Sequence, residues 1–247
     1  MKRYLTFLKT EGKLWMRCPD CLIFGLAMPL GVLLLIGLVG GDKMVSADDS
    51  YTFLQSAFAS VAVVGICATA FMSIPLTVAE YRDKKILKHL FVTPCSPVLF
   101  LGVIVTLAGI VSILSALSVA AATVFGFVYR MPGNPVVFAG AYLLVMASMF
   151  SMGTLLAGLC KNMKVTNVAC SLVYFPMLFL SGATVPFEIF PAGLQNVAAV
   201  LPLTQGVRLM KEISLGMPLS SVLVPVVILT GITIVCTIAA AFTFRWE

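Results

Sequence analysis

Six long apolar segments limit what this chain can fold into. They cover roughly residues 21–40, 53–79, 99–128, 136–160, 166–187 and 221–243, and none carries Asp, Glu, Lys or Arg in its middle. A helix needs about 20 apolar residues to cross a hydrocarbon core. Because lipid offers no hydrogen-bonding partners to the backbone, segments of this length fold as helices. The sequence therefore predicts an all-α integral membrane protein with six transmembrane helices, in a single domain over residues 1–247.

Composition and charge distribution support this prediction. The chain is 60% hydrophobic and 11% charged, whereas soluble domains carry about 25% charged residues. Twelve of the 16 Lys and Arg residues fall on the cytoplasmic side if the N-terminus is cytoplasmic. This asymmetry predicts a protein of the plasma or inner membrane with both termini in the cytoplasm. The net charge of +6 then belongs to the face that meets anionic headgroups, and it does not suggest a nucleic-acid partner.

Residues 1–19 are expected to form an interfacial helix before the first span. The apolar face of this helix holds Tyr4, Leu5, Leu8 and Trp15, and its basic face holds Lys9, Lys13 and Arg17. A cleavable signal peptide is the alternative for the first span, but its charged lead and apolar core are both long for one.

Short apolar pieces fill residues 182–216, before the last span. They are interrupted at Gly182, Pro186, Pro191, Gly193 and Pro202. Broken helices are tolerated at membrane depth where protein buries them or where they line a cavity. We therefore expect re-entrant helices in the outer leaflet, with a loop lying on the headgroups as the alternative.

The third and fourth expected spans carry residues suited to helix packing. Close helix approach in lipid depends on small side chains, and these spans offer Ser112, Ser115, Ser118, Gly153 and Ala157. Three methionines also share a face of the fourth span: Met146, Met149 and Met152. The adaptable Met side chain could line a path for bulky apolar molecules, and ordinary packing is the alternative.

The sequence lacks the motifs of nucleotide binding, ion coupling and catalysis. Gly12 and Lys13 precede Leu14 and do not form a P-loop, and His89 is the chain's single His. The spans hold no ionisable residue of the kind that ion-coupled carriers need. Cys18 and Cys21 form a CxxC that could join Cys95 and Cys160 in a four-thiolate site, although free thiols fit a reducing compartment better. We expect neither catalysis nor a bound cofactor on this chain.

A basic amphipathic segment, "EYRDKKILKHLFVTPCSP", covers residues 80–97. Drawn as one helix over 81–92, it gathers an apolar stripe opposite its basic residues. The stripe consists of Ile86, Leu87, Leu90 and Phe91, and the opposite side of Lys84, Lys85, Lys88 and His89. Such a helix can lie on the membrane or present its stripe to a partner groove.

This segment resembles the cytoplasmic loop of type-two ABC exporter permeases, which reads close to E-E-R-E-R-G-T-L-x-x-L-x-x-T-P-x-S-P. The matching positions are Glu80, Arg82, Asp83, Lys84, Leu87, Leu90, Thr93, Pro94, Ser96 and Pro97. Lys85 and Ile86 depart from the family's Gly and Thr. The order of "FLSG" (179–182), Pro186, Pro191, Leu194, "LPLT" (201–204), Arg208 and Gly216 is similar to that family's second signature.

The resemblance implies a membrane subunit of an exporter. Two such permeases pair, as a homodimer or a related heterodimer, and each binds a separate ATPase subunit that holds ATP and Mg. The loop over 80–97 would be the coupling helix, with ATPase contact at Glu80, Arg82, Asp83, Lys84, Ile86, Leu87, Leu90, Phe91, Thr93 and Pro94. An outer gate would comprise Gly182, Pro186, Pro191, Pro202 and Thr204.

The cargo implied by the resemblance is a drug-like or amphipathic molecule. A lipid-linked glycan or polysaccharide is the alternative, and the methionines at 146, 149 and 152 would line the candidate substrate path. From other classes, an ATP-independent carrier and a structural or sensory membrane subunit also remain open.

Overall fold

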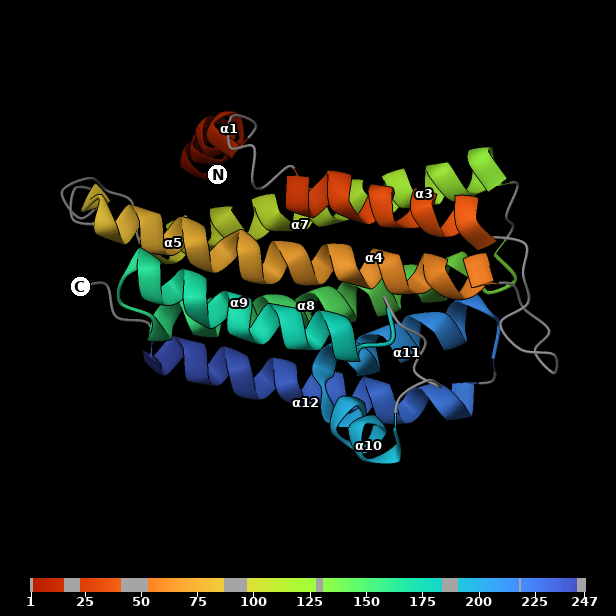
Figure 1. Ribbon diagram of the computed structural model, residues 1–247. Helices are drawn as coiled ribbons and strands as arrows, with labels where there is room; N and C mark the ends of the chain where they lie inside the picture. Colours follow the sequence, from red (N-terminus) through yellow and green to blue (C-terminus); the bar gives the residue numbers. More distant parts are fainter. Residues whose placement is uncertain are drawn as a thin grey trace.

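The computed structural model describes residues 2–15, 23–40, 53–86, 97–127, 131–183, 191–217 and 219–243, and every regular element in these ranges is helical. Most of the helices run alongside one another as an elongated bundle (Figure 1). The bundle consists of the short π-helix η1 (Ile23–Ala27) with α3 (Met28–Gly40), then α4 (Phe53–Met72), α5 (Ile74–Asp83), α7 (Pro97–Ala121) with η2 (Ala122–Gly126), α8 (Pro135–Leu159), α9 (Met163–Leu180) and α12 (Leu219–Thr243). The predicted all-α class is confirmed.

Five helices of the described chain are long and apolar enough to cross a membrane. They are Leu54–Asp83, Leu99–Gly126, Pro135–Leu159, Met163–Leu180 and Val222–Thr243. Each overlaps one of the expected spans. The first expected span, 21–40, contains a shorter apolar helix, Gly25–Leu38, which packs against α4 and α7. The chain is therefore a multi-pass membrane protein with five candidate spans and one shorter apolar helix.

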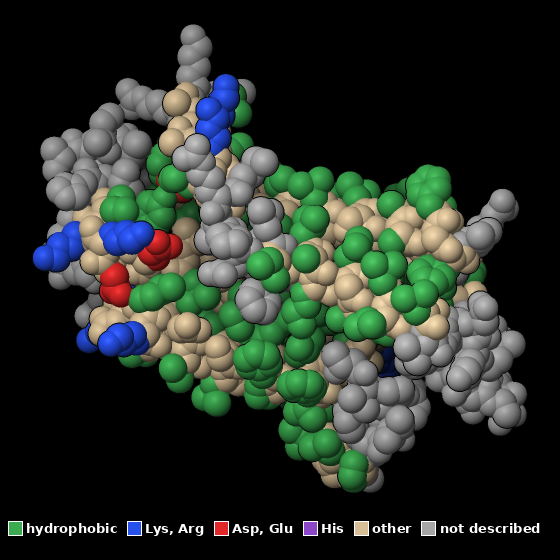
Figure 2. Space-filling view, turned by 45° about the horizontal axis from the view of Figure 1, so that its top comes forward, with side chains coloured by type: hydrophobic (Ala, Val, Ile, Leu, Met, Phe, Trp, Pro, Cys, Tyr) green, Lys and Arg blue, Asp and Glu red, His purple; other side chains and the backbone are tan. Residues whose placement is uncertain are grey.

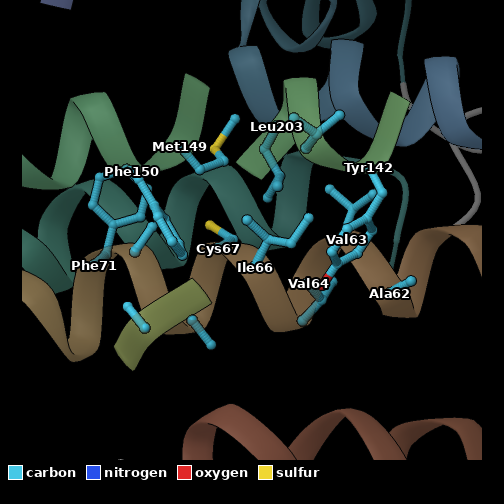
Figure 3. Packing of buried hydrophobic residues seen from close by; sticks show 14 of the residues in the cluster. Ala62, Val63, Val64, Ile66, Cys67, Phe71, Tyr142, Met149, Phe150 and Leu203 are labelled. Atoms are coloured by element: carbon cyan, nitrogen blue, oxygen red, sulfur yellow. The ribbon is translucent and has the colours of Figure 1, made fainter. Parts of the chain in front are cut away.

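Helix α4 lies at the centre of the bundle and contacts α3, α7, α8, α9 and α11. Phe71 of α4 lies beside Phe150 of α8, and Ile66 belongs to the same buried cluster (Figure 3). The predicted role of Gly153 in close helix packing is confirmed, since a Cβ atom there would lie 2.2 Å from the Ala70 carbonyl oxygen.

Polar side chains also join α4 to α7. The Thr69 and Ser112 hydroxyl oxygens lie 2.5 Å apart, and Tyr142 of α8 donates a hydrogen bond of 2.6 Å to the Ser112 carbonyl. Both contacts are buried. Because a buried hydroxyl needs a partner, the hydroxyls of Thr69 and Tyr142 each bond to Ser112, which links α4 and α8 to α7.

The long central span is interrupted where the sequence places Pro75. α4 ends at Met72 and α5 begins at Ile74, with Pro75 in its first turn and Ser73 between the two helices. Pro75 has no N–H to continue the hydrogen-bonding ladder. The two helices nevertheless follow one another along the molecule (Figure 1), so α5 extends α4 toward one end.

The expectation of one helix over 81–92 is wrong. α5 ends at Asp83, and Lys84 and Lys85 form a turn in which Lys85 has a φ of +55°. A positive φ places a residue in the left-handed region, which ends a right-handed helix. Residues 80–83 therefore close the membrane helix and do not begin a separate one, while residues 87–96 lie outside the described part of the chain.

Helix α1 (Lys2–Trp15) crosses the other helices beside the beginning of α7 (Figure 1). Tyr4 anchors it, because its hydroxyl lies 2.6 Å from the Thr106 hydroxyl of α7. The predicted apolar face needs a correction, since Leu5 is 57% exposed whereas Glu11 is only 4% exposed. The inward face continues from Tyr4 through Glu11 to Trp15, and Leu5 points away from it.

Two short helices precede α12. α10 (Ala192–Val200) projects from the side of the bundle (Figure 1) and packs on α11 (Pro202–Ser214). One face of α11 is buried against α4, α8 and α12. Its end meets the turn between η2 and α8, where Gly133 N–H donates to the Ser214 carbonyl at 3.1 Å. A side chain at 133 would collide with the backbone of α11.

Candidate coupling site at the end of α5

The last turn of α5 lies at the charged end of the molecule. Figure 2 shows Lys, Arg, Asp and Glu side chains gathered at this end of the visible face, with hydrophobic side chains along the helices. Among the described basic residues, Lys84 and Lys85 follow α5, and Lys161 and Lys164 flank the beginning of α9; all four are exposed. The basic residues after α5 and at the beginning of α9, which the charge distribution predicts on the same side of the membrane, therefore lie at the same end of the bundle.

Tyr81 joins the end of α5 to α1. Its hydroxyl donates toward both carboxylate oxygens of Glu11, at 2.7 and 2.6 Å, and its ring packs on Phe100 of α7 at a centroid distance of 5.1 Å. Burial raises the pKa of the Glu11 carboxyl, and the hydrogen bond from Tyr81 offsets part of this rise. The buried acid thus has a partner on the helix that leads into the basic loop.

Arg82 joins the end of α5 to the end of α8. Its guanidinium Nη1 donates to the Cys160 carbonyl and lies 3.4 Å from the Ala157 carbonyl oxygen. These carbonyls belong to the last turn of α8, where backbone acceptors have no intrahelical partner. A cation at a helix C-terminus also interacts favourably with the helix dipole.

Asp83 joins the end of α5 to the beginning of α9. Its Oδ2 accepts a hydrogen bond of 3.0 Å from the backbone N–H of Met163, the first residue of α9. The residue at the N-cap position, Asn162, makes no capping bond with its own side chain. Asp83 therefore supplies, from another helix, an acceptor for one of the N–H groups in the first turn of α9 that have no partner within the helix.

The remaining described residues of the predicted coupling set are more open. Glu80 and Lys84 form an ion pair one turn apart, with side chains 45% and 61% exposed, and Ile86 is partly buried. The other five predicted contacts, Leu87, Leu90, Phe91, Thr93 and Pro94, lie outside the described residues. Of the predicted coupling residues, the structure thus describes those from Glu80 to Ile86, where α5 ends and the loop begins.

The residues predicted for an outer gate lie at the ends of three helices. Gly182, with a φ of +78°, follows the end of α9. Pro191 directly precedes α10, and Pro202 is the first residue of α11. Thr204 is buried within α11. Pro186 lies outside the described residues.

The three methionines of α8 belong to the packed interior. Met149 is fully buried, and Met146 and Met152 pack against the same core. In a single chain this arrangement is helix packing, so lining of a substrate path stays a prediction that would need a second subunit.

No metal site appears in the described ranges. No group of three or more His, Cys, Asp or Glu side chains there could hold an ion. Of the four cysteines considered for a thiolate site, Cys160 is a buried free thiol, and Cys18, Cys21 and Cys95 lie outside the described residues.

Sequence reasoning missed the roles of Glu11 and Tyr81. The available signal was a lone acid on the face that also carries Tyr4, Leu8 and Trp15, since an acid there must be buried with a partner. The identity of that partner could not be read from the pattern, because Tyr81 lies 70 positions away.

Comparison with known proteins places the chain in a family. A family model described as "ABC-2 family transporter protein" matches residues 23–242. Nodulation protein J of Rhizobium leguminosarum bv. viciae is 36% identical over 72 residues, which cover 29% of this chain and 28% of that protein. "Probable multidrug ABC transporter permease YbhR" of Escherichia coli K12 is 25% identical over 169 residues, covering 68% of this chain and 45% of that one.

These matches span less than half the length of either relative. No solved structure matches the chain at a significant level. The family model nevertheless extends from η1 to the end of α12. Together with the apolar helices and the charged loop base, it shows that this chain belongs to the ABC-2 family of transporter proteins.

Proposed function

We propose that the chain is the membrane subunit of an ATP-driven exporter, paired with a second permease and coupled to a separate ATPase subunit that binds ATP and Mg. The observation that carries this proposal is the family match over residues 23–242. ABC-2 membrane subunits are transport components that generally lack catalysis of their own, so ATP hydrolysis belongs to the partner.

The charged end of the bundle faces the cytoplasm in this proposal. The positive-inside rule supports it, because the basic residues near α1, after α5 and before α9 share that end. The helix from Ile23 to Gly40 would then be the first of six spans along the chain. The loop that follows Lys84 would dock on the ATPase through its apolar residues Ile86, Leu87, Leu90 and Phe91. The last turn of α5, with Glu80, Arg82 and Asp83, would support that loop.

Helices α10 and α11 would form the outer gate as re-entrant elements. The burial of one face of α11 among α4, α8 and α12 supports this placement over a loop on the headgroups. Pro191 and Pro202 at the helix starts, and Gly182 after α9, would then set the turns at which the chain enters and leaves the outer leaflet.

The proposed cargo is a drug-like or amphipathic molecule. It is supported by the similarity to a permease named for multidrug transport and by the apolar character of the spans. Methionines at 146 and 152 would contact such a cargo only if pairing of two permeases exposed the partly buried side of α8.

The test is transport by the assembled complex. The chain would be co-expressed with candidate ABC ATPases, purified and reconstituted in vesicles, and uptake of fluorescent amphipathic dyes into inside-out vesicles measured with and without ATP. We expect an ATPase to co-purify and dye uptake to require ATP hydrolysis. Uptake without ATP that an ionophore abolishes would instead identify an ion-coupled carrier, and hydrolysis without any cargo movement a sensory or structural subunit.

Replacement of Leu87 by Asp tests the docking face. A charge on the apolar stripe should uncouple hydrolysis from uptake, because a buried unpaired carboxylate cannot be accommodated in an apolar groove. Leu87→Met keeps the apolar character and serves as the matched control. Normal dye uptake by the Leu87→Asp complex, with wild-type membrane insertion, would rule out this docking model.

A further inference from the structure

Three consecutive residues at the end of α5 each bond to a different part of the molecule. Tyr81 reaches Glu11 on α1, Arg82 reaches the last carbonyls of α8, and Asp83 reaches the first amide of α9. These partners lie 70, 78 and 80 positions away along the chain. The last turn of α5 is therefore a junction of four helices.

Helix geometry explains how one turn can do this. Successive side chains of an α-helix point about 100° apart, so three neighbouring residues point in three directions around the axis. α5 packs between α7, α8 and α9, and α1 lies across the beginning of α7. A helix in that position meets a separate neighbour with each of these side chains.

The chemistry of two of the bonds is complementary to the ends of the helices that they join. A guanidinium meets the negative end of α8, and a carboxylate meets the positive end of α9. Both bonds involve one charged group, which makes them stronger than bonds between neutral groups. They hold the two sides of the α8–α9 turn, from Cys160 to Met163, on the end of α5.

The junction also lies directly before the basic loop. Only Lys84 and Lys85 separate Asp83 from the residues that begin the loop. A force on the loop therefore reaches the bundle through the two helices that flank the loop, the last turn of α5 and the beginning of α7 at Pro97. Since that turn is bonded to α1, α8 and α9, its displacement must either move those elements or break the bonds.

We propose that Tyr81, Arg82 and Asp83 are positioning residues that transmit movement of the basic loop to α1 and to the α8–α9 pair. The inference rests on the proposed coupling of this loop to an ATPase, and it replaces direct ATPase contact as the role of Arg82 and Asp83. Helix α8 runs from this junction toward the opposite end of the bundle (Figure 1), so the junction would carry movement across the membrane.

Asp83 offers the sharpest test, because two replacements separate its hydrogen bond from its charge. Asp83→Asn keeps a side-chain oxygen that can accept from Met163 N–H, and Asn caps helices about as well as Asp. Asp83→Ala removes the acceptor. If the carboxylate served instead as a charged contact for the ATPase, Asn and Ala would be equally damaging.

Two measurements are made on each variant. The first is hydrogen exchange at the beginning of α9 in the permease alone, reconstituted in nanodiscs. The second is the number of dye molecules moved per ATP hydrolysed by the complete complex in vesicles. For Asp83→Ala we expect exchange about fivefold faster and dye moved per ATP about fivefold lower, the equivalent of one lost cap. Asp83→Asn should stay near wild type in both.

Each other outcome overturns a defined part of the inference. Wild-type exchange in Asp83→Ala would refute the bond to α9, and a normal ratio of dye to ATP despite faster exchange would refute transmission through it. An Asn variant as defective in transport as the Ala variant would assign Asp83 to a charged partner contact. A wild-type complex without ATP-driven transport would refute the proposed function and transmission together, while exchange in the permease alone would still decide whether the junction exists.

Discussion

Replacement of Gly153 by Ala should destabilise the bundle, because α8 approaches the backbone of α4 most closely there. An added Cβ would lie 2.2 Å from the Ala70 carbonyl oxygen and 3.1 Å from its carbon. Ordinary contact begins at 3.4 Å, so the helices would have to separate by about 1 Å at this point. A gap of that size forfeits a quarter to half of the attraction between the facing atoms.

The expected cost follows from two opposing effects. Ala is favoured over Gly within a helix by about 1 kcal/mol, whereas overpacking a core costs about 1–3 kcal/mol, occasionally more. Contact with backbone leaves no side-chain rotation to relieve it, so the cost should lie at the upper end. We expect a net loss of about 1–2 kcal/mol, which corresponds to a melting temperature about 2–8 °C lower for a chain of this size.

Gly140 provides the matched control, because it lies on the same helix with nothing within 4 Å of an added Cβ. Gly140→Ala should therefore raise the melting temperature slightly through helix propensity alone. The measurement is thermal unfolding of both purified variants in one detergent, followed by intrinsic fluorescence. If both substitutions shifted the melting temperature in the same direction, the close contact between α8 and α4 would not be the reason that position 153 requires Gly.

Two further predictions concern the coupling site. Lys85→Gly should be about 1 kcal/mol more stable than Lys85→Ala, since both remove the charge but only Gly adopts a φ of +55° without strain; equal thermal stability of the two would contradict a left-handed residue there. Because burial raises the Glu11 pKa above its ordinary 4.5, the folded state binds this proton more tightly, so stability should fall as pH rises above about 4.5. Glu11→Gln should flatten that fall in melting scans from pH 5 to 8, and an unchanged slope would assign the pH dependence to another group.

Some of the candidate site could be predicted from residue patterns. The match at Glu80, Arg82, Asp83 and Lys84 singled out the segment, but the departure at Lys85 was not recognised as the place where the helix ends. Drawing one helix over 81–92 failed because a left-handed residue at 85 cannot be recognised in a Lys, whereas the family's Gly would have signalled it. The apolar face of α1 was predicted except for Leu5 and Glu11, since a charged residue is assigned to water unless its partner is known.

The sequence by itself determined the membrane setting, the helical class and the approximate bounds of five spans. These follow from the local balance between backbone hydrogen bonding and lipid, which apolar length decides. Only the tertiary structure decided that α4 is central, that Glu11 is buried beneath Tyr81, and that Asp83 caps α9. Each of these depends on which distant segments lie side by side, and a contact such as that between Asp83 and Met163, 80 positions apart, leaves no periodic trace in the chain.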